Sequence, residues 1–270
     1  MTTLVFIHHF GGSARSWDAV ISRLGDGCDT LALDLPGFGD AADEPGPYTV
    51  AAYADFVEWR LSSGRFVLVG HSMGGKVAMA VAARRPVGLA GLVLLAPSPP
   101  TPEPIADDGR AALIAGWGEY SAMSRTLAEI TAGALPDAVR ASTIDDMMRA
   151  GKAAWDAWLT HGSREDISFA MSQIDVPVTI LSGSADAVLP SAVLIREVAA
   201  RLLDVRNVAV PGAGHLLPLE APDAVAAAIM QVLAELDETG PKHPVGFGAD
   251  VMEGFVGHSG ARDRVNTSGS

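Results

Sequence analysis

A serine in a glycine-rich turn is the residue of this sequence whose surroundings most clearly indicate chemistry. The segment from Phe66 to Ala80 is FVLVGHSMGGKVAMA, in which an apolar run precedes Gly70-x-Ser72-x-Gly74 and a helical pattern follows. A nucleophile elbow has this spacing, because its serine lies in a strained turn that exposes the hydroxyl above a sheet. The helix N-terminus that follows can stabilise a developing oxyanion. The pattern therefore predicts that Ser72 is a nucleophile.

The same segment also matches most of a phosphate-binding loop. Residues Gly70 to Lys76 fit Gly-x-x-x-x-Gly-Lys between a strand and a helix. The next position of such a loop carries a hydroxyl for magnesium, whereas this chain has Val77, which cannot bind a cation. We therefore favour the nucleophile over a nucleotide site.

An aspartate and a histidine follow two later apolar runs. Asp186 ends the segment that starts at Val178, and His215 ends a glycine-rich loop after Val210. Nucleophile, acid and base thus each follow the C-terminal end of a predicted parallel strand, the edge where open α/β sheets place functional groups. At that edge His215 would deprotonate Ser72, while Asp186 would hold the imidazole tautomer and stabilise its cation.

The elements that must position these residues alternate along the chain. Apolar, β-branched runs and helical patterns follow each other, which is typical of βαβ units around a parallel sheet. The expected strands span residues 4–8, 30–34, 66–70, 89–96, 176–182 and 204–210. Helices are expected behind Ser13 or Ser16, from Thr49, from Pro190 and over residues 220–236.

The alternation stops between Ser98 and Ser172. A proline-rich turn opens this stretch, and helical patterns without a convincing strand fill it, so we predict a helical cap inserted between two strands. The predicted organisation is core 1–97, cap 98–172, core 173–237 and a Gly-rich C-terminal tail 238–270. Three of the five tryptophans lie in the cap, and we expect some of them to line a pocket above the serine and others to join the cap to the core. These residues are Trp117, Trp155 and Trp158.

Composition limits the classes of partner. No apolar run approaches the ~18 residues of a membrane helix. The single cysteine, Cys28, excludes an internal disulfide, and without a signal-peptide pattern it favours a cytoplasmic protein. The net charge of −13 disfavours nucleic acid and anionic membranes. A small-molecule substrate is the expected partner, no metal site is expected, and the oligomeric state is left open.

Taken together, these motifs resemble those of enzymes with the α/β-hydrolase fold, over about residues 4–236. The resemblance rests on IHHFGGS at 7–13, DLPGFG at 34–39, GHSMGG at 70–75, GSAD at 183–186 and GAGH at 212–215. It implies a mainly parallel sheet of about six strands flanked by helices, with the helical cap as an insertion, and no cofactor.

The resemblance also implies an oxyanion hole formed by the backbone amides of Phe10 and Met73. The family usually has His-Gly where this chain has His8-His9, so a bulky His9 lies beside the oxyanion loop. The chain also begins at what is usually the third strand of the sheet, so two edge strands are expected to be absent.

The expected activity is that of a serine esterase, resembling carboxylesterases, which cleaves a small to medium apolar ester through an acyl-enzyme on Ser72. Candidate substrate contacts are Phe10, His71 and the three cap tryptophans. The same machinery serves thioesters, lactones, amides, some C–C bonds, acyl transfer and perhydrolysis, and the fold does not choose among them. A non-catalytic ligand-binding protein is the other alternative. Asp34 is expected to hold a structural turn and Glu220 to complement a helix dipole.

Overall fold

Parallel strands form one sheet in the computed structural model, which describes residues 2–239 of the chain. Within that range the sheet has six strands in the order β2-β1-β3-β4-β5-β6, with every neighbouring pair parallel. The chain changes its direction of winding between β1 and β3, and open α/β sheets bind ligands at such a point. The strands are β1 Thr3–Ile7, β2 Asp29–Leu33, β3 Phe66–His71, β4 Leu89–Leu95, β5 Val178–Gly183 and β6 Val205–Val210. The predicted fold class is confirmed, and each predicted strand agrees to within two residues at either end.

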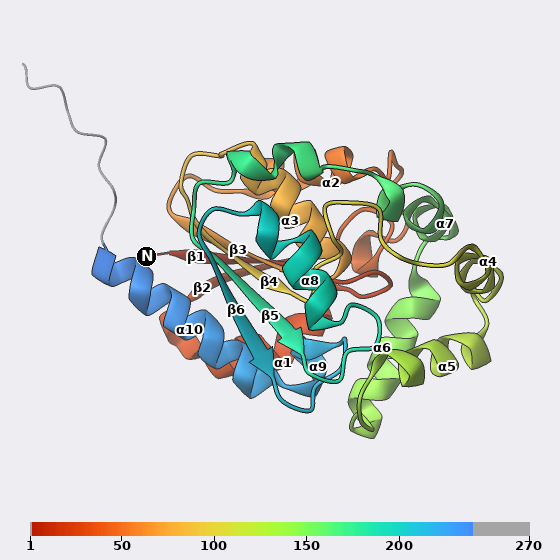
Figure 1. Ribbon diagram of the computed structural model, residues 1–270. Helices are drawn as coiled ribbons and strands as arrows, with labels where there is room; N and C mark the ends of the chain where they lie inside the picture. Colours follow the sequence, from red (N-terminus) through yellow and green to blue (C-terminus); the bar gives the residue numbers. More distant parts are fainter. Residues whose placement is uncertain (1, 240–270) are drawn as a thin grey trace, which may run out of the picture. The chain divides into compact units, whose positions relative to one another are not determined.

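Figure 1 shows helices on both faces of the sheet, and alternate residues of the strands enter two separate cores, one on each face. Val5 and Ile7 pack on the face covered by α2 Val50–Arg60, α3 Met73–Ala83 and α8 Ser191–Glu197. Leu4 and Phe6 pack on the opposite face, against α1 Asp18–Leu24 and α10 Pro222–Thr239. Both faces of the sheet are covered, which explains the nearly continuous apolar sequence of its central strands.

Side-chain caps start two of the predicted helices. The Ser13 hydroxyl accepts a hydrogen bond from the Arg15 amide at the start of η1 Ala14–Trp17, and Thr49 accepts one from Ala52 at the start of α2. Pro190 proves to be the residue before α8 rather than its first residue. The remaining short 3-10 helices outside the insertion are η2 Gly25–Gly27, η3 Gly39–Ala41 and η6 Ala199–Arg201.

The helix predicted from about Glu220 to Leu236 begins two residues later, at Pro222, and ends three residues later, at Thr239. A short α9, Leu217–Glu220, precedes α10, which begins at Pro222. Proline fits the first position of a helix but cannot donate an amide to the preceding turn, so the chain breaks before it. Glu220 consequently ends α9 instead of starting the long helix.

The regular elements of the insertion between β4 and β5, residues 98–172, are all helices. The insertion contains α4 Asp107–Ala115, α5 Tyr120–Ile130, α6 Asp137–Arg149 and α7 Lys152–Thr160, followed by η4 Gly162–Arg164 and η5 Ser168–Gln173. No strand interrupts residues 98–172, all of which the structure describes. None of the helices between residues 2 and 239 has the length and hydropathy of a bilayer-spanning segment. Residues 240–270, most of the predicted tail, lie outside the described residues.

A buried lysine fastens both ends of the insertion to the helix that follows Ser72. Lys76 has no exposed surface, and its ammonium group donates to the carbonyl oxygens of Thr101 and Glu165. Thr101 lies where the insertion begins and Glu165 near its end. The lysine that completes the phosphate-loop pattern is thus engaged with the protein backbone.

Replacing Lys76 by methionine should remove a pH-dependent part of the stability. Burial lowers the pKa of Lys76 to about 8, against the opposing effect of Glu103 and Glu165. An unfolded lysine titrates near ~10.4, so the unfolded chain binds the extra proton between these values and stability rises with pH there. Across this pH window, the free energy of unfolding of the wild type, measured in urea, should rise by roughly 3 kcal/mol more than that of Lys76→Met. Parallel pH profiles for the two proteins would contradict the expectation.

Candidate active site

The turn between β3 and α3 holds Ser72 in a strained backbone conformation. Its φ of 51° and ψ of −115° lie in a region that residues with a side chain rarely adopt. The flanking glycines are required by close approach: a Cβ on Gly70 would lie 2.5 Å from the Gly74 oxygen, and one on Gly74 would lie 2.3 Å from the Ile7 oxygen. The Gly-x-Ser-x-Gly spacing therefore forms a sharp elbow at the switch point of the sheet.

The structure brings the three predicted catalytic side chains together. The hydroxyl of Ser72 lies 3.0 Å from Nε2 of His215, and Nδ1 of His215 lies 2.9 Å from Oδ2 of Asp186. In a neutral imidazole that donates from Nδ1 to the carboxylate, Nε2 is free to accept the serine proton. The residues are at most 7% exposed, so this chain of hydrogen bonds is shielded from solvent.

The carboxylate of Asp186 is oriented by its own loop. Oδ1 accepts hydrogen bonds from the amides of Val188 (2.8 Å) and Leu189 (3.0 Å), which leaves Oδ2 for His215. Burial opposes ionisation of this carboxyl, but the hydrogen bond and charge of His215 and the two amides outweigh it, so the pKa of Asp186 is lowered. Asp186 is consequently an anion at neutral pH, as the stabiliser of an imidazolium must be.

The imidazole of His71 is hydrogen-bonded to the backbone of His215 and not to Ser72. Its Nε2 donates to the backbone oxygen of His215 at 2.8 Å, and the side chain is fully buried. Burial and the charge of His215 lower the pKa of His71 to about 3, so its imidazole is neutral. In this structure His71 supports the loop of His215, and its predicted contact with a substrate stays a prediction.

The loop after β1 contains Phe10, whose amide is expected to form an oxyanion hole with that of Met73. His8 donates from Nδ1 to the His9 oxygen and accepts at Nε2 from the Leu35 amide, which ties this loop to the end of β2. The bulky His9 is buried, with its ring 4.9 Å from that of His71. A Cβ on Gly12 would lie 2.5 Å from this ring, so Gly12 is what makes room for a histidine here. His9 therefore points into the core.

Comparison with known proteins identifies the family of this chain. Residues 4–228 match a family model described as the alpha/beta hydrolase family, which is more than half of the chain. The chain belongs to the alpha/beta hydrolase family. The predicted resemblance is thereby confirmed.

Relatives of this α/β hydrolase have different activities. The 2-succinyl-6-hydroxy-2,4-cyclohexadiene-1-carboxylate synthase of Enterobacter sp. (strain 638) is 31% identical over 85% of this chain and 91% of its own length. The pimeloyl-[acyl-carrier protein] methyl ester esterase of Neisseria meningitidis is 29% identical over 68% of this chain and 75% of its own. The structure of a thermophilic esterase from Thermogutta terrifontis superposes with a TM-score of 0.72, at 24% identity, covering 87% of this chain and 90% of that one. This last likeness shows the fold alone.

Three of the aromatic residues predicted to contact substrate in this α/β hydrolase, Phe10, Trp155 and Trp158, pack together. The half-buried ring of Phe10 lies 4.3 Å from that of Trp155 and 6.4 Å from that of Trp158. Both tryptophans are buried, and the indole nitrogen of Trp155 donates to the Leu113 oxygen. Trp117 is half-buried and donates to the backbone within the insertion. These contacts join the insertion to the oxyanion loop, and the role of the aromatic residues in substrate binding stays a prediction.

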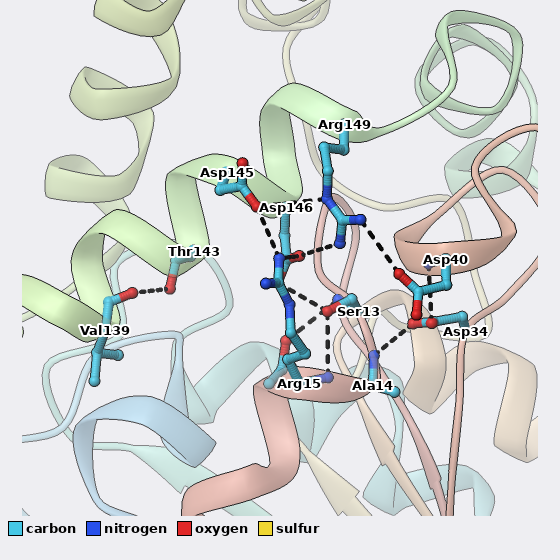
Figure 2. Close-up of polar contacts among 11 residues, drawn as sticks. Ser13, Ala14, Arg15, Asp34, Asp40, Val139, Thr143, Asp145, Asp146 and Arg149 are labelled. Carbon is cyan, nitrogen blue, oxygen red and sulfur yellow. Dashed lines mark hydrogen bonds and ion pairs between the residues drawn. The ribbon is translucent and has the colours of Figure 1, made fainter.

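A polar network that no sequence pattern indicated joins α6 to the loop after β1 (Figure 2). The hydroxyl of Ser13 donates to Asp146 at 2.8 Å, and Asp146 also pairs with Arg15 and with Arg149 (3.1 Å). Asp34 accepts hydrogen bonds from the amides of Ala14 and Asp40, so it holds a turn as predicted. Ser13 and Asp146 lie 133 positions apart in the sequence, a separation at which local spacing carries no signal.

Replacing Asp146 by alanine should destabilise the protein far more than replacing its neighbour Asp145. The Asp146 side chain is 4% exposed and that of Asp145 55%, although both pair with Arg15. Loss of Asp146 leaves the buried Ser13 hydroxyl without its acceptor, so we expect about 2 kcal/mol less free energy of unfolding. Asp145→Ala should change it by less than about 0.5 kcal/mol. Urea unfolding measures both, and equal losses would contradict the assignment.

Proposed function

We propose that this α/β hydrolase cleaves a carboxylic ester through an acyl-enzyme on Ser72. The observation that carries the proposal is the continuous hydrogen-bonded chain from Ser72 through His215 to Asp186, with distances of 3.0 and 2.9 Å. A serine hydroxyl is a weak nucleophile until an adjacent base accepts its proton. Such a chain provides that base and the anion that stabilises its protonated form.

The proposed reaction proceeds in two halves. As Oγ of Ser72 adds to the ester carbonyl carbon, His215 takes the serine proton at Nε2, and it then gives this proton to the departing alcohol oxygen. Water next enters, loses a proton to His215 and attacks the acyl group. The tetrahedral intermediate collapses when Ser72 leaves with that proton, which releases the acid.

The oxyanion of each tetrahedral intermediate is proposed to bind the amides of Phe10 and Met73. Met73 is the first residue of α3, so its amide has no acceptor within the helix and lies at the positive end of the helix dipole. Phe10 lies in the loop after β1, two residues beyond His8, whose backbone oxygen closely approaches Gly74 of the elbow. Two such donors aimed at one oxygen supply the electrostatic part of acyl-transfer catalysis.

A second candidate activity is that of the synthase relatives, the formation of 2-succinyl-6-hydroxy-2,4-cyclohexadiene-1-carboxylate. The 31% identity to the Enterobacter enzyme favours it. The product for which that enzyme is named is a carboxylate that bears a succinyl group, and cationic side chains are strong partners of such an anion. Two buried cations of this chain are already engaged with backbone oxygens: Lys76 of α3 donates to those of Thr101 and Glu165, and Arg110 of α4 to those of Leu159 and Glu103. Neither of these two cations is offered to a carboxylate substrate, which favours an uncharged, mainly apolar ester.

A substrate panel tests the choice between the two activities. p-Nitrophenyl esters of increasing acyl length should be cleaved, with kcat/KM rising about fourfold per buried methylene, or roughly 0.8 kcal/mol, until the pocket is full. A lactone, a thioester and the substrate of the Enterobacter synthase complete the panel. Ser72→Ala serves as the blank for every compound. If the synthase product forms while no ester is cleaved, the second activity replaces the first.

A further inference from the structure

The backbone amides of the residues before and after His215 are bound by one carboxylate. Glu220 accepts hydrogen bonds from the amide of Gly214 (3.0 Å) at Oε2 and from the amide of Leu216 (2.9 Å) at Oε1. The amide of His215 itself donates to the Ile130 oxygen at 2.9 Å. Three successive amides of the His215 loop therefore have defined acceptors, two of them on the same side chain.

The same carboxylate reaches the insertion. Oε2 of Glu220 accepts a third amide, that of Ala132, at 2.8 Å. Ile130 is the last residue of α5, and Ala132 lies two residues beyond it. The amide of His215 and the carboxylate of Glu220 are therefore both hydrogen-bonded to this segment. The fit is tight, because a Cβ on Gly214 would lie 2.5 Å from the Ala132 nitrogen.

Attraction to a helix dipole does not account for these contacts. Glu220 does lie in the first turn of α9, but that helix has four residues and its dipole is correspondingly small. A dipole attracts a carboxylate without selecting partners, whereas Glu220 binds the two amides that flank His215 and an amide 88 residues away. The prediction that Glu220 complements a helix dipole therefore covers only a small part of its role.

We infer that Glu220 is a positioning residue for His215, and that it couples the placement of this imidazole to residues 130–132 of the insertion. The inference rests on the proposed function for its catalytic meaning. The orientation of His215 is set from three directions: Asp186 at Nδ1, His71 at the backbone oxygen and Glu220 at the flanking amides. A displacement of about 1 Å between reacting groups can cost on the order of 100-fold in rate.

The central variants are Glu220→Gln and Glu220→Ala, with Asp223→Asn as the matched control. Glutamine has the same shape but presents an amide to at least one of the three N–H donors, and alanine removes every acceptor. Asp223 lies three residues further on, pairs with Arg23 and has a side chain that is 84% exposed. We expect kcat to fall about tenfold in Glu220→Gln and about 100-fold in Glu220→Ala, with little change in KM. The control should match the wild type.

A second pair of variants tests the link to the insertion. Ala132→Pro removes the amide that Glu220 accepts, and Thr131 before it already has the extended backbone (φ −103°, ψ 143°) that a residue preceding proline requires. Gly214→Ala introduces the clash with Ala132. Both should lower kcat in the same direction as Glu220→Gln, without a matching rise in KM.

Proton NMR gives a readout that does not depend on turnover. The Nδ1 proton of His215, hydrogen-bonded to Asp186, should give a low-field resonance in the wild type that broadens through exchange in Glu220→Gln and Glu220→Ala. This arm works even if the panel of esters is not cleaved, so failure of the proposed function is separated from failure of this inference. An unchanged resonance in both variants would overturn it. A fall in kcat that is fully explained by a smaller folded fraction, measured by thermal unfolding, would also overturn the inference.

Discussion

Replacing Ser72 by alanine is expected to lower kcat for ester cleavage on the order of 10⁶-fold. The variant loses the nucleophile, and His215 loses the group whose proton it accepts at 3.0 Å. Because serine and alanine both carry a Cβ, the strained φ of 51° is no worse in the variant. The fold should be preserved, with a midpoint of thermal unfolding within about 2 °C of the wild type. Steady-state kinetics and differential scanning calorimetry measure the two effects.

Covalent labelling tests the same assignment independently of any substrate. A fluorophosphonate should add once to the wild type, and peptide mass spectrometry should place the adduct on Ser72. The exposed hydroxyl of Ser22 on α1 provides the control, and Ser22→Ala should be labelled and active like the wild type. An adduct on another residue, together with activity in Ser72→Ala, would exclude Ser72 as the nucleophile.

Asp186→Asn is expected to lower kcat about 10⁴-fold while it keeps the shape of the site. The asparagine oxygen can still accept the amides of Val188 and Leu189, so its NH₂ group faces Nδ1 of His215. An NH₂ donor at Nδ1 stabilises the tautomer with the proton on Nε2. That nitrogen then has no lone pair for the proton of Ser72. Kinetics give the loss, and ¹⁵N NMR of the imidazole reports the tautomer.

The other carboxylate that follows a strand provides the comparison for Asp186. Asp34 binds the amides of Ala14 and Asp40, so Asp34→Asn should affect stability and leave kcat within about threefold of the wild type. A larger loss of kcat in Asp34→Asn than in Asp186→Asn would reverse the assignment of the acid.

The sequence alone determined the sheet, the elbow and the approximate place of each proposed catalytic side chain. The elbow was predictable because its constraint is local: Gly70 and Gly74 must lack side chains within a few residues of Ser72. The convergence of Ser72, Asp186 and His215 followed from a general property of parallel sheets, whose strands all end at one edge. The long apolar runs were sufficient to predict the strands, because a sheet that is covered on both faces requires such runs.

Only the tertiary structure decided what holds these side chains in place. The Glu220 contact with Ala132 and the Ser13 contact with Asp146 join residues 88 and 133 positions apart. Such hydrogen bonds depend on how the insertion docks on the loops of the core, which neither composition nor spacing encodes. The break between α9 and α10 follows locally from Pro222, but only the tertiary structure shows that the Glu220 carboxylate at this break binds the amides of Gly214 and Leu216. Local spacing thus indicates which residues can react, whereas packing between distant segments sets their orientation.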